Sequence, residues 1–195
     1  MGIQDREHLA VSSAAELVAW LEQNHATSLG LWVVTHKKSA NHPAPTYDEI
    51  VRAVLCFGWV DSVPGKVDDE RTKLYVSPRK STSAWSQTNK KRVAELIASG
   101  EMRPSGMAAI DVAKANGAWS LIDGAQEAEI PDDLAAEFLN HPGSRDNFDA
   151  FPRGVRKQIL EWIAVAKTDA TRSKRIVETA SLAAQNVRAN QWRAP

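Results

Sequence analysis

The chain has 195 residues, of which 43% are hydrophobic and 25% are charged, and its 24 Lys+Arg balance 24 Asp+Glu. These proportions are typical of a folded protein and exclude a mostly disordered chain. No stretch approaches the ~20 apolar residues of a membrane-spanning helix, and the start, MGIQDREHLA, has no apolar core of the signal-peptide kind. The single cysteine, Cys56, cannot form an internal disulfide. We therefore expect a cytoplasmic protein with no membrane span.

The net charge of zero conceals three blocks of charge. Residues 77–103 carry six basic and two acidic side chains, residues 122–149 carry eight acidic and one basic, and residues 152–195 carry nine basic and three acidic. Asymmetry on this scale can mark a face that binds anions. The alternative is that the acidic and basic blocks pack beside each other as solvated surfaces.

Helix and strand signals alternate over the first 80 residues. Capping boxes that begin at Ser13 and Thr46 predict helices that reach Asn24 and Gly58. Three short apolar or alternating runs predict strands over residues 29–34, 59–63 and 72–77, with a turn at Pro64-Gly65. This pattern predicts a small three-stranded, mostly antiparallel sheet with two helices packed against it, and Trp32 and Trp59 as core residues.

The remainder of the chain is predicted to be helical. Ser83 is placed to cap a helix through Ala98, and the later helical segments are expected from Pro104 to before Gly117 and over residues 131–140, 144–150, 153–167 and 170–189. The fold class is therefore α+β, with a helical C-terminal part. We divide the chain into an α/β domain, residues 1–120, and a helical part, residues 121–195, packed on it or forming one domain with it.

The common catalytic and metal-binding motifs do not occur in the sequence. There is no phosphate-binding loop ending in Gly-Lys-Ser/Thr, no G-x-G-x-x-G and no G-x-S-x-G. The five histidines do not pair at the helical spacing of a zinc protease, and one cysteine cannot build a structural zinc site. No catalytic residue, metal or cofactor is predicted. Cys56 lies in an apolar run near the end of a helix, which is typical of a core thiol rather than a nucleophile.

Polar chemistry is concentrated in residues 77–92, which hold six hydroxyl residues and five cations around a predicted helix start. Backbone N–H groups at a helix start favour anions, and Arg79 suits a bidentate grip on phosphate or carboxylate. Trp85 is placed to stack on a flat ligand or to anchor the helix. The alternative is a well-capped amphipathic helix with solvated lysines.

Several strings of this chain resemble one protein family. They are Tyr47-Asp-Glu, Leu55-Cys-Phe-Gly-Trp-Val-Asp-Ser62, Ser77-Pro-Arg-Lys, Ser83-Ala-Trp-Ser-Gln-Thr-Asn-Lys and Ala166-Lys-Thr-Asp-Ala-Thr-Arg-Ser-Lys-Arg-Ile. Together they resemble the YdeI/OmpD-associated proteins, also called bacteriocin-protection proteins, over residues 20–182. The resemblance implies a bacterial protein with a small α/β part and a helical C-terminal part. It implies no mechanism and no catalytic residue.

The favoured hypothesis is a binding module for an anionic small ligand that carries phosphate or carboxylate. Strand ends beside a helix start are a common place for such a site. The candidate ligand-binding residues are Lys37, Lys38, Asp61, Ser62, Arg71, Ser77, Arg79, Ser83, Trp85, Ser86 and Asn89. Within this set, Arg79 and Lys38 are expected to point toward one cavity lined by Ser83 or Ser86.

Three alternative functions remain open at this point. A nucleic-acid binder would use the basic run Lys90-Lys91-Arg92 and the basic C-terminal helices, but the zero net charge and the acidic block disfavour it. An enzyme would draw on Asp61, Arg71 and Arg79, although no base–nucleophile spacing supports one. An interaction protein would dock its basic C-terminal face on an acidic protein partner.

Overall fold

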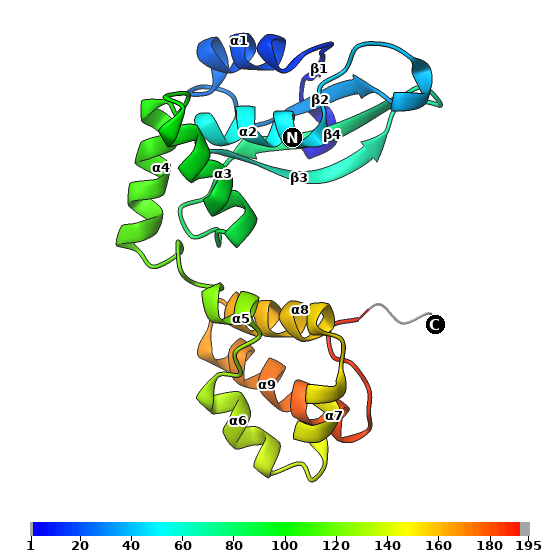
Figure 1. The fold of residues 1–195 in the computed structure, drawn as a ribbon, viewed down its shortest axis with the longest axis vertical. Coiled ribbons are helices and arrows are strands. Elements are labelled where there is room, and N and C mark those ends of the chain that lie inside the picture. The colour runs from blue at the N-terminus through cyan, green and yellow to red at the C-terminus, as the bar shows by residue number, and fades with distance from the viewer. Residues whose placement is uncertain (1, 192–195) are drawn as a thin grey trace. The chain divides into compact units, whose positions relative to one another are not determined.

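The computed structural model describes residues 2–191, which fold as two units (Figure 1). Unit 1 contains the residues up to Ser83 together with Thr88–Asn116, and unit 2 contains Ala84–Gln87 together with the residues from Gly117 onward. The division into residues 1–120 and 121–195 stays a prediction, and residues 192–195 of its second part lie outside the described residues.

Unit 1 contains a four-stranded mixed sheet in the order β1-β2-β4-β3. Its strands are β1 (His8–Ala10), β2 (Leu31–His36), β3 (Trp59–Lys66) and β4 (Arg71–Pro78). β1 pairs with β2 in parallel, whereas β4 pairs with β2 and β3 in antiparallel fashion. The α+β class is confirmed, but the prediction of three strands is wrong because β1 was missed. A strand of three residues is too short to show an alternating pattern.

The hairpin of β3 and β4 turns later than the sequence indicates. The predicted turn at Pro64-Gly65 lies inside β3, where a register shift between Asp61 and Pro64 marks a bulge. β3 is an edge strand, and an edge strand tolerates proline because one of its sides needs no ladder hydrogen bonds. The actual turn follows Lys66, and the Asp68 carboxylate accepts the backbone N–H of Arg71 at 2.7 Å there.

The capping boxes predict the first two helices correctly. α1 (Ala14–Asn24) begins after Ser13, and α2 (Tyr47–Cys56) begins after Thr46, whose side chain accepts the N–H of Glu49. In Figure 1, α2 lies along the sheet with α1 above it. Unit 1 is completed by α3 (Gln87–Ala98), of which the residues from Thr88 onward belong to it, and by α4 (Pro104–Ala115).

α3 begins four residues after the predicted cap at Ser83, so Trp85 and Ser86 precede the helix. The reason is tertiary packing of the segment Ala84–Gln87. Trp85 is 1% exposed and its ring centroid lies 5.1 Å from that of Trp119. The backbone N–H of Gln87 donates to the side chain of Gln126 at 2.6 Å. These contacts replace the hydrogen bonds that an earlier helical turn would make.

The predicted core residues of unit 1 are buried. Trp32 and Trp59 are each 1% exposed, and both indole N–H groups donate to backbone carbonyls, of Ile3 at 2.7 Å and of His25 at 3.3 Å. Cys56 is also buried, and burial raises the pKa of its thiol. These placements confirm the two tryptophans as core anchors and Cys56 as a buried residue.

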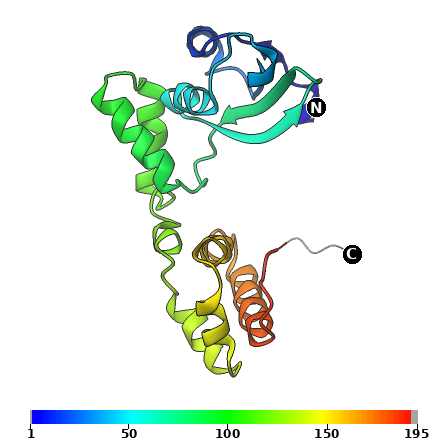
Figure 2. The same ribbon diagram turned by 45° about the vertical axis from the view of Figure 1, so that its right-hand side comes forward.

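Unit 2 is helical. It contains α5 (Asp123–Glu127), α6 (Asp132–Leu139), α7 (Ser144–Ala150), α8 (Arg153–Ala164) and α9 (Asp169–Ala184). α9 packs against α6, α7 and α8, which are drawn in yellow-green to gold beside the orange α9 in Figure 2. The core between them is apolar and includes Leu134, Phe148, Ile159, Ile163 and Ala180. None of the helices within residues 2–191 is both long and apolar enough to cross a membrane.

The acidic block of residues 122–149 pairs with the basic block that follows it, within unit 2. Three ion pairs join the two blocks: Glu127–Arg153 at 3.3 Å, Asp133–Arg172 at 2.7 Å and Asp149–Arg156 at 3.7 Å. The structure therefore agrees with the alternative in which the acidic and basic blocks pack beside each other. Pairs this exposed contribute little individually, but they neutralise part of the basic surface that a nucleic acid or acidic partner would use.

Candidate functional site

A pocket of about 600 Å³ lies in unit 1, where the end of β2 and the start of α2 meet β3 and β4. The buried side chain of Ile50 lines it together with Leu74, and two prolines, Pro45 and Pro64, complete the apolar part. Five hydroxyl groups also line the pocket, from Thr35, Thr46, Tyr47, Ser62 and Thr72. An apolar cavity with a few polar groups is the usual form of a small-molecule site.

Four of the eleven predicted site residues line this pocket: Lys37, Lys38, Asp61 and Ser62. The two lysines follow β2, and the other two residues lie on β3 near its bulge. The sheet brings them together because β4 pairs with both β2 and β3, and these three strands contribute to one surface under α2.

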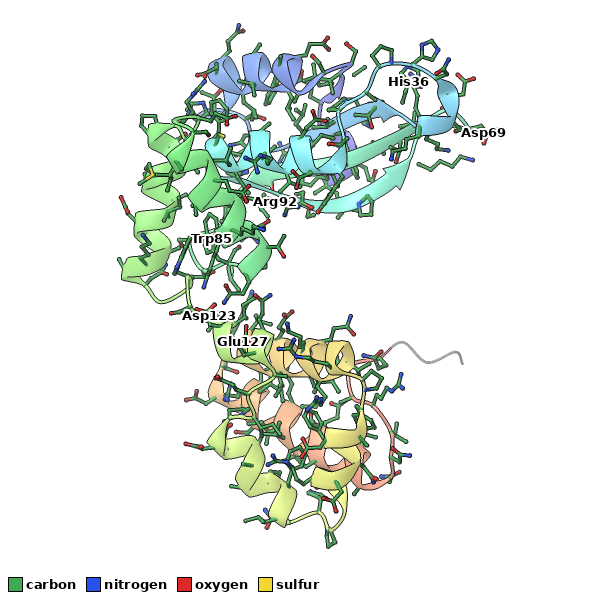
Figure 3. The ribbon with its side chains drawn as sticks, viewed as in Figure 1. His36, Asp69, Trp85, Arg92, Asp123 and Glu127 are labelled. Atoms are coloured by element: carbon green, nitrogen blue, oxygen red, sulfur yellow. The ribbon has the colours of Figure 1, made fainter. Side chains whose placement is uncertain are left out.

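The two adjacent lysines differ in their surroundings. The Lys37 ammonium donates to the backbone carbonyls of Asp68 and Asp69, both at 3.0 Å, and so fastens the β3–β4 turn to the end of β2. Figure 3 shows His36 and Asp69 at this end of the sheet. Lys38 is exposed, and its ammonium forms no hydrogen bond or ion pair with the residues that the structure describes. Lys38 is therefore the cation of this pair that can meet a ligand.

Tyr47 and Asp61, which both line the pocket, form a hydrogen-bonded pair. The Tyr47 hydroxyl donates to Asp61 Oδ2 at 2.7 Å. Burial and the hydrogen bond to Asp61 raise the pKa of Tyr47 to about 12. The tyrosine therefore stays protonated at neutral pH and acts as a donor that holds the carboxylate in place, not as a base.

A second polar cluster joins α2 and α3. Arg92 donates from Nε to Asp48 at 2.8 Å and from Nη1 to Asn89 Oδ1 at 2.8 Å, and Figure 3 shows Arg92 on the side of α3 that faces α2.

Burial lowers the pKa of the Arg79 guanidinium to about 10, and the negative charge of Asp61 opposes this shift. Asp61 therefore belongs to the pocket and acts electrostatically on Arg79.

The other predicted residues lie outside the lining of the pocket. Arg71 pairs with Asp68 in the β3–β4 turn, with Nη2 at 2.6 Å from the carboxylate. Asp61 is the register partner of Val76, so these two side chains lie on the same face of the sheet. Ser77 follows Val76 on β4, and its side chain is therefore on the opposite face. Arg79, Ser83 and Asn89 belong to unit 1 but do not line the pocket, whereas Trp85 and Ser86 belong to unit 2. The lining contains Lys38 but none of Arg79, Ser83 and Ser86.

The sequence analysis missed His36 and Tyr47, which also line the pocket. The Nδ1 atom of His36 is buried without a hydrogen-bond partner among the described residues, and its ring centroid lies 4.6 Å from that of His42. The capping box did mark the start of α2, but as a helix signal. Nothing in the pattern indicated that the first residue of that helix would reach the carboxylate on β3.

Within residues 2–191, the structure contains no group of three or more His, Cys, Asp or Glu side chains that could hold a metal ion. The residues that line the pocket carry hydroxyl, ammonium, imidazole and carboxylate groups.

Two family models match the chain. Residues 9–109, just over half of the 195, match the family described as Domain of unknown function (DUF8412), and residues 127–186 match the family described as Bacteriocin-protection, YdeI or OmpD-Associated. Comparisons with curated proteins and with solved structures gave no match. The string at Ala166 lies inside the second match, whereas the strings from Tyr47 to Lys80 lie inside the first, so the recognised family extends over less of the chain than residues 20–182. The chain therefore belongs to the family described as Domain of unknown function (DUF8412), and its resemblance to the Bacteriocin-protection, YdeI or OmpD-Associated family is confirmed by the match over residues 127–186.

Proposed function

We propose that the protein is a non-catalytic binding module for a small anionic ligand, bearing phosphate or carboxylate, which occupies the pocket of unit 1. One observation carries the proposal: the exposed ammonium of Lys38 has no partner among the described residues and adjoins a cavity with an apolar floor. A charge-assisted hydrogen bond from this ammonium would contribute ~1.5–3 kcal/mol to holding an anion.

The surrounding groups support recognition rather than catalysis. The Tyr47 hydroxyl, with a pKa of about 12, is held protonated by burial and by Asp61. Cys56 lies outside the lining of this pocket, and burial raises the pKa of its thiol. Neither group is suited to act as a base or nucleophile at neutral pH, because each would have to ionise first.

A thermal-shift screen with inorganic phosphate, pyrophosphate and a set of carboxylates tests the proposal. A ligand at 100 times its Kd stabilises the folded state by about 2.7 kcal/mol, which is a shift of several degrees for a domain of this size. Lys38→Ala should weaken binding about tenfold and so reduce the shift to roughly half at the same ligand concentration. Lys91→Ala removes an equally exposed lysine from α3, outside the pocket lining, and should keep it. If no anion stabilises the wild-type protein, or if both variants respond alike, the proposal is wrong.

The proposal includes a cytoplasmic location. The single cysteine supports it, because Cys56 is buried as a free thiol and contributes no disulfide. Fractionation of bacterial cells that produce the protein would test this, and recovery in the periplasmic fraction would contradict it.

A further inference from the structure

The pocket presents fewer usable cations than its lining suggests. Lys37, Lys38 and Lys73 all contribute to the lining. The Lys37 ammonium is held by two backbone carbonyls of the β3–β4 turn. The Lys73 ammonium lies 4.2 Å from the centroid of the Trp32 ring and 3.1 Å from His8 Nε2, on the face of the sheet away from α2. Only one lysine of this lining, Lys38, is without such a partner among the described residues.

A negative charge also lines the pocket. Asp61 accepts a hydrogen bond from the Tyr47 hydroxyl at 2.7 Å, which fixes the position of its carboxylate. The one available ammonium in the lining, that of Lys38, can pair with a single negative charge on a ligand, and the fixed carboxylate of Asp61 adds no positive charge. A group with two or more negative charges would meet Asp61 with no second available ammonium or guanidinium among the described residues of the lining to offset the repulsion.

The apolar part of the lining indicates the chemistry of the ligand beyond its anionic group. Ile50 is 4% exposed and Pro45 is buried, so this part of the lining presents carbon rather than charge. Each methylene group buried on such a surface strengthens binding roughly fourfold. A bare inorganic anion would leave this surface uncovered.

We infer that the pocket takes a monocarboxylate with an apolar body, in preference to a phosphorylated or polyphosphate ligand. This inference rests on the proposed function and specifies its ligand class. The carboxylate meets Lys38, the apolar body covers Ile50 and Leu74, and Asp61 excludes polyanions. Asp61 is thus a specificity-determining residue and not a ligand for the anion.

The test is calorimetric titration of the full-length protein with acetate, hexanoate, 3-phenylpropanoate, 3-phenylpropanamide and pyrophosphate. We expect affinity to rise from acetate to the two larger carboxylates, and the neutral amide and pyrophosphate to bind at least tenfold more weakly than 3-phenylpropanoate. Lys38→Ala should weaken 3-phenylpropanoate about tenfold, and Lys91→Ala should leave it unchanged. Asp61→Asn keeps an acceptor for Tyr47 and should strengthen pyrophosphate binding severalfold.

The outcomes separate this inference from the proposed function. If pyrophosphate binds more tightly than 3-phenylpropanoate and depends on Lys38, the anion module stands and the inferred ligand class is wrong. If Asp61→Asn does not change the preference, Asp61 is not the discriminating residue and the inference fails in that part. If the amide binds as well as the carboxylate, or no anion binds, the proposed function and the inference are both overturned. Circular dichroism of each variant shows whether it is folded.

Discussion

Two glycines in unit 1 allow a backbone effect to be separated from a packing effect. Gly58 and Gly100 each follow a helix and have the same φ, +75°. A side chain is disfavoured at this positive φ by roughly 1–2 kcal/mol. The neighbours differ: a Cβ at Gly58 would lie 2.9 Å from Ala109 Cβ and 2.9 Å from the backbone oxygen of Ser105, whereas a Cβ at Gly100 would meet nothing within 4 Å.

We therefore expect Gly100→Ala to cost only the backbone penalty, about 1–2 kcal/mol. Gly58→Ala should cost that amount and a further ~1–3 kcal/mol, because α4 must move away from the end of α2 to admit the methyl group. Both glycines lie in unit 1, so both changes act on the same cooperative transition.

Urea denaturation followed by tryptophan fluorescence measures the two costs, with the m-value checked for each variant. Equal losses for the two variants would refute the reasoning, because they would show that the α2–α4 contact yields without cost. A loss below ~0.5 kcal/mol for Gly100→Ala would contradict the backbone part, since that is the range of neutral surface changes.

Three further predictions follow from the core and the pocket. Trp59→Ala should destabilise unit 1 by ~3–5 kcal/mol, since the ring is 1% exposed, and a loss under about 1 kcal/mol in denaturation would contradict its role as an anchor. Cys56 should resist a thiol reagent at neutral pH until the protein is unfolded, because burial raises the pKa of the thiol, and rapid native labelling would contradict this. Because the folded-state pKa of Tyr47 is raised from 10.0 to about 12, the unfolded chain loses that proton first as pH rises. Stability should therefore fall between these two pH values, and Tyr47→Phe should remove this part of the loss in alkaline denaturation curves.

Local signals predict much of the fold. The capping box at Thr46 forms in full, whereas at Ser13 only the side-chain cap forms because the Glu16 carboxylate accepts from Ser12 instead. Both caps act within four residues of chain, so the starts of α1 and α2 can be predicted from local sequence. β1 is different, because its three residues are a strand only through pairing with β2, more than twenty residues away. The start of α3 likewise depends on the burial of Trp85, which is a tertiary effect that overrides the capping propensity of Ser83.

The candidate site could likewise be predicted only where it depends on local sequence. That Lys38 and Asp61 line one pocket could be anticipated, because both lie near strand positions of one small sheet. The hydrogen bond from Tyr47 to Asp61 could not be anticipated. It depends on a distance of 2.7 Å between the hydroxyl of the first residue of α2 and a carboxylate at a β-bulge. Register and bulges are set by pairing across strands, which a single sequence does not display.

The distribution of partners, rather than the number of cations, decides where this chain can bind an anion. The sequence singled out blocks rich in lysine and arginine, but in the structure Arg71 pairs with Asp68, Arg92 with Asp48 and Arg172 with Asp133. Each of these cations already has a carboxylate within 3 Å, and a ligand would have to compete with it at a cost similar to its own gain. Lys38 faces no such competition from the described residues, and it adjoins an apolar cavity. A single unpaired ammonium beside an apolar surface favours a ligand that has one negative charge and an apolar body. We therefore expect the pocket to prefer one carboxylate on a hydrocarbon body over several phosphates.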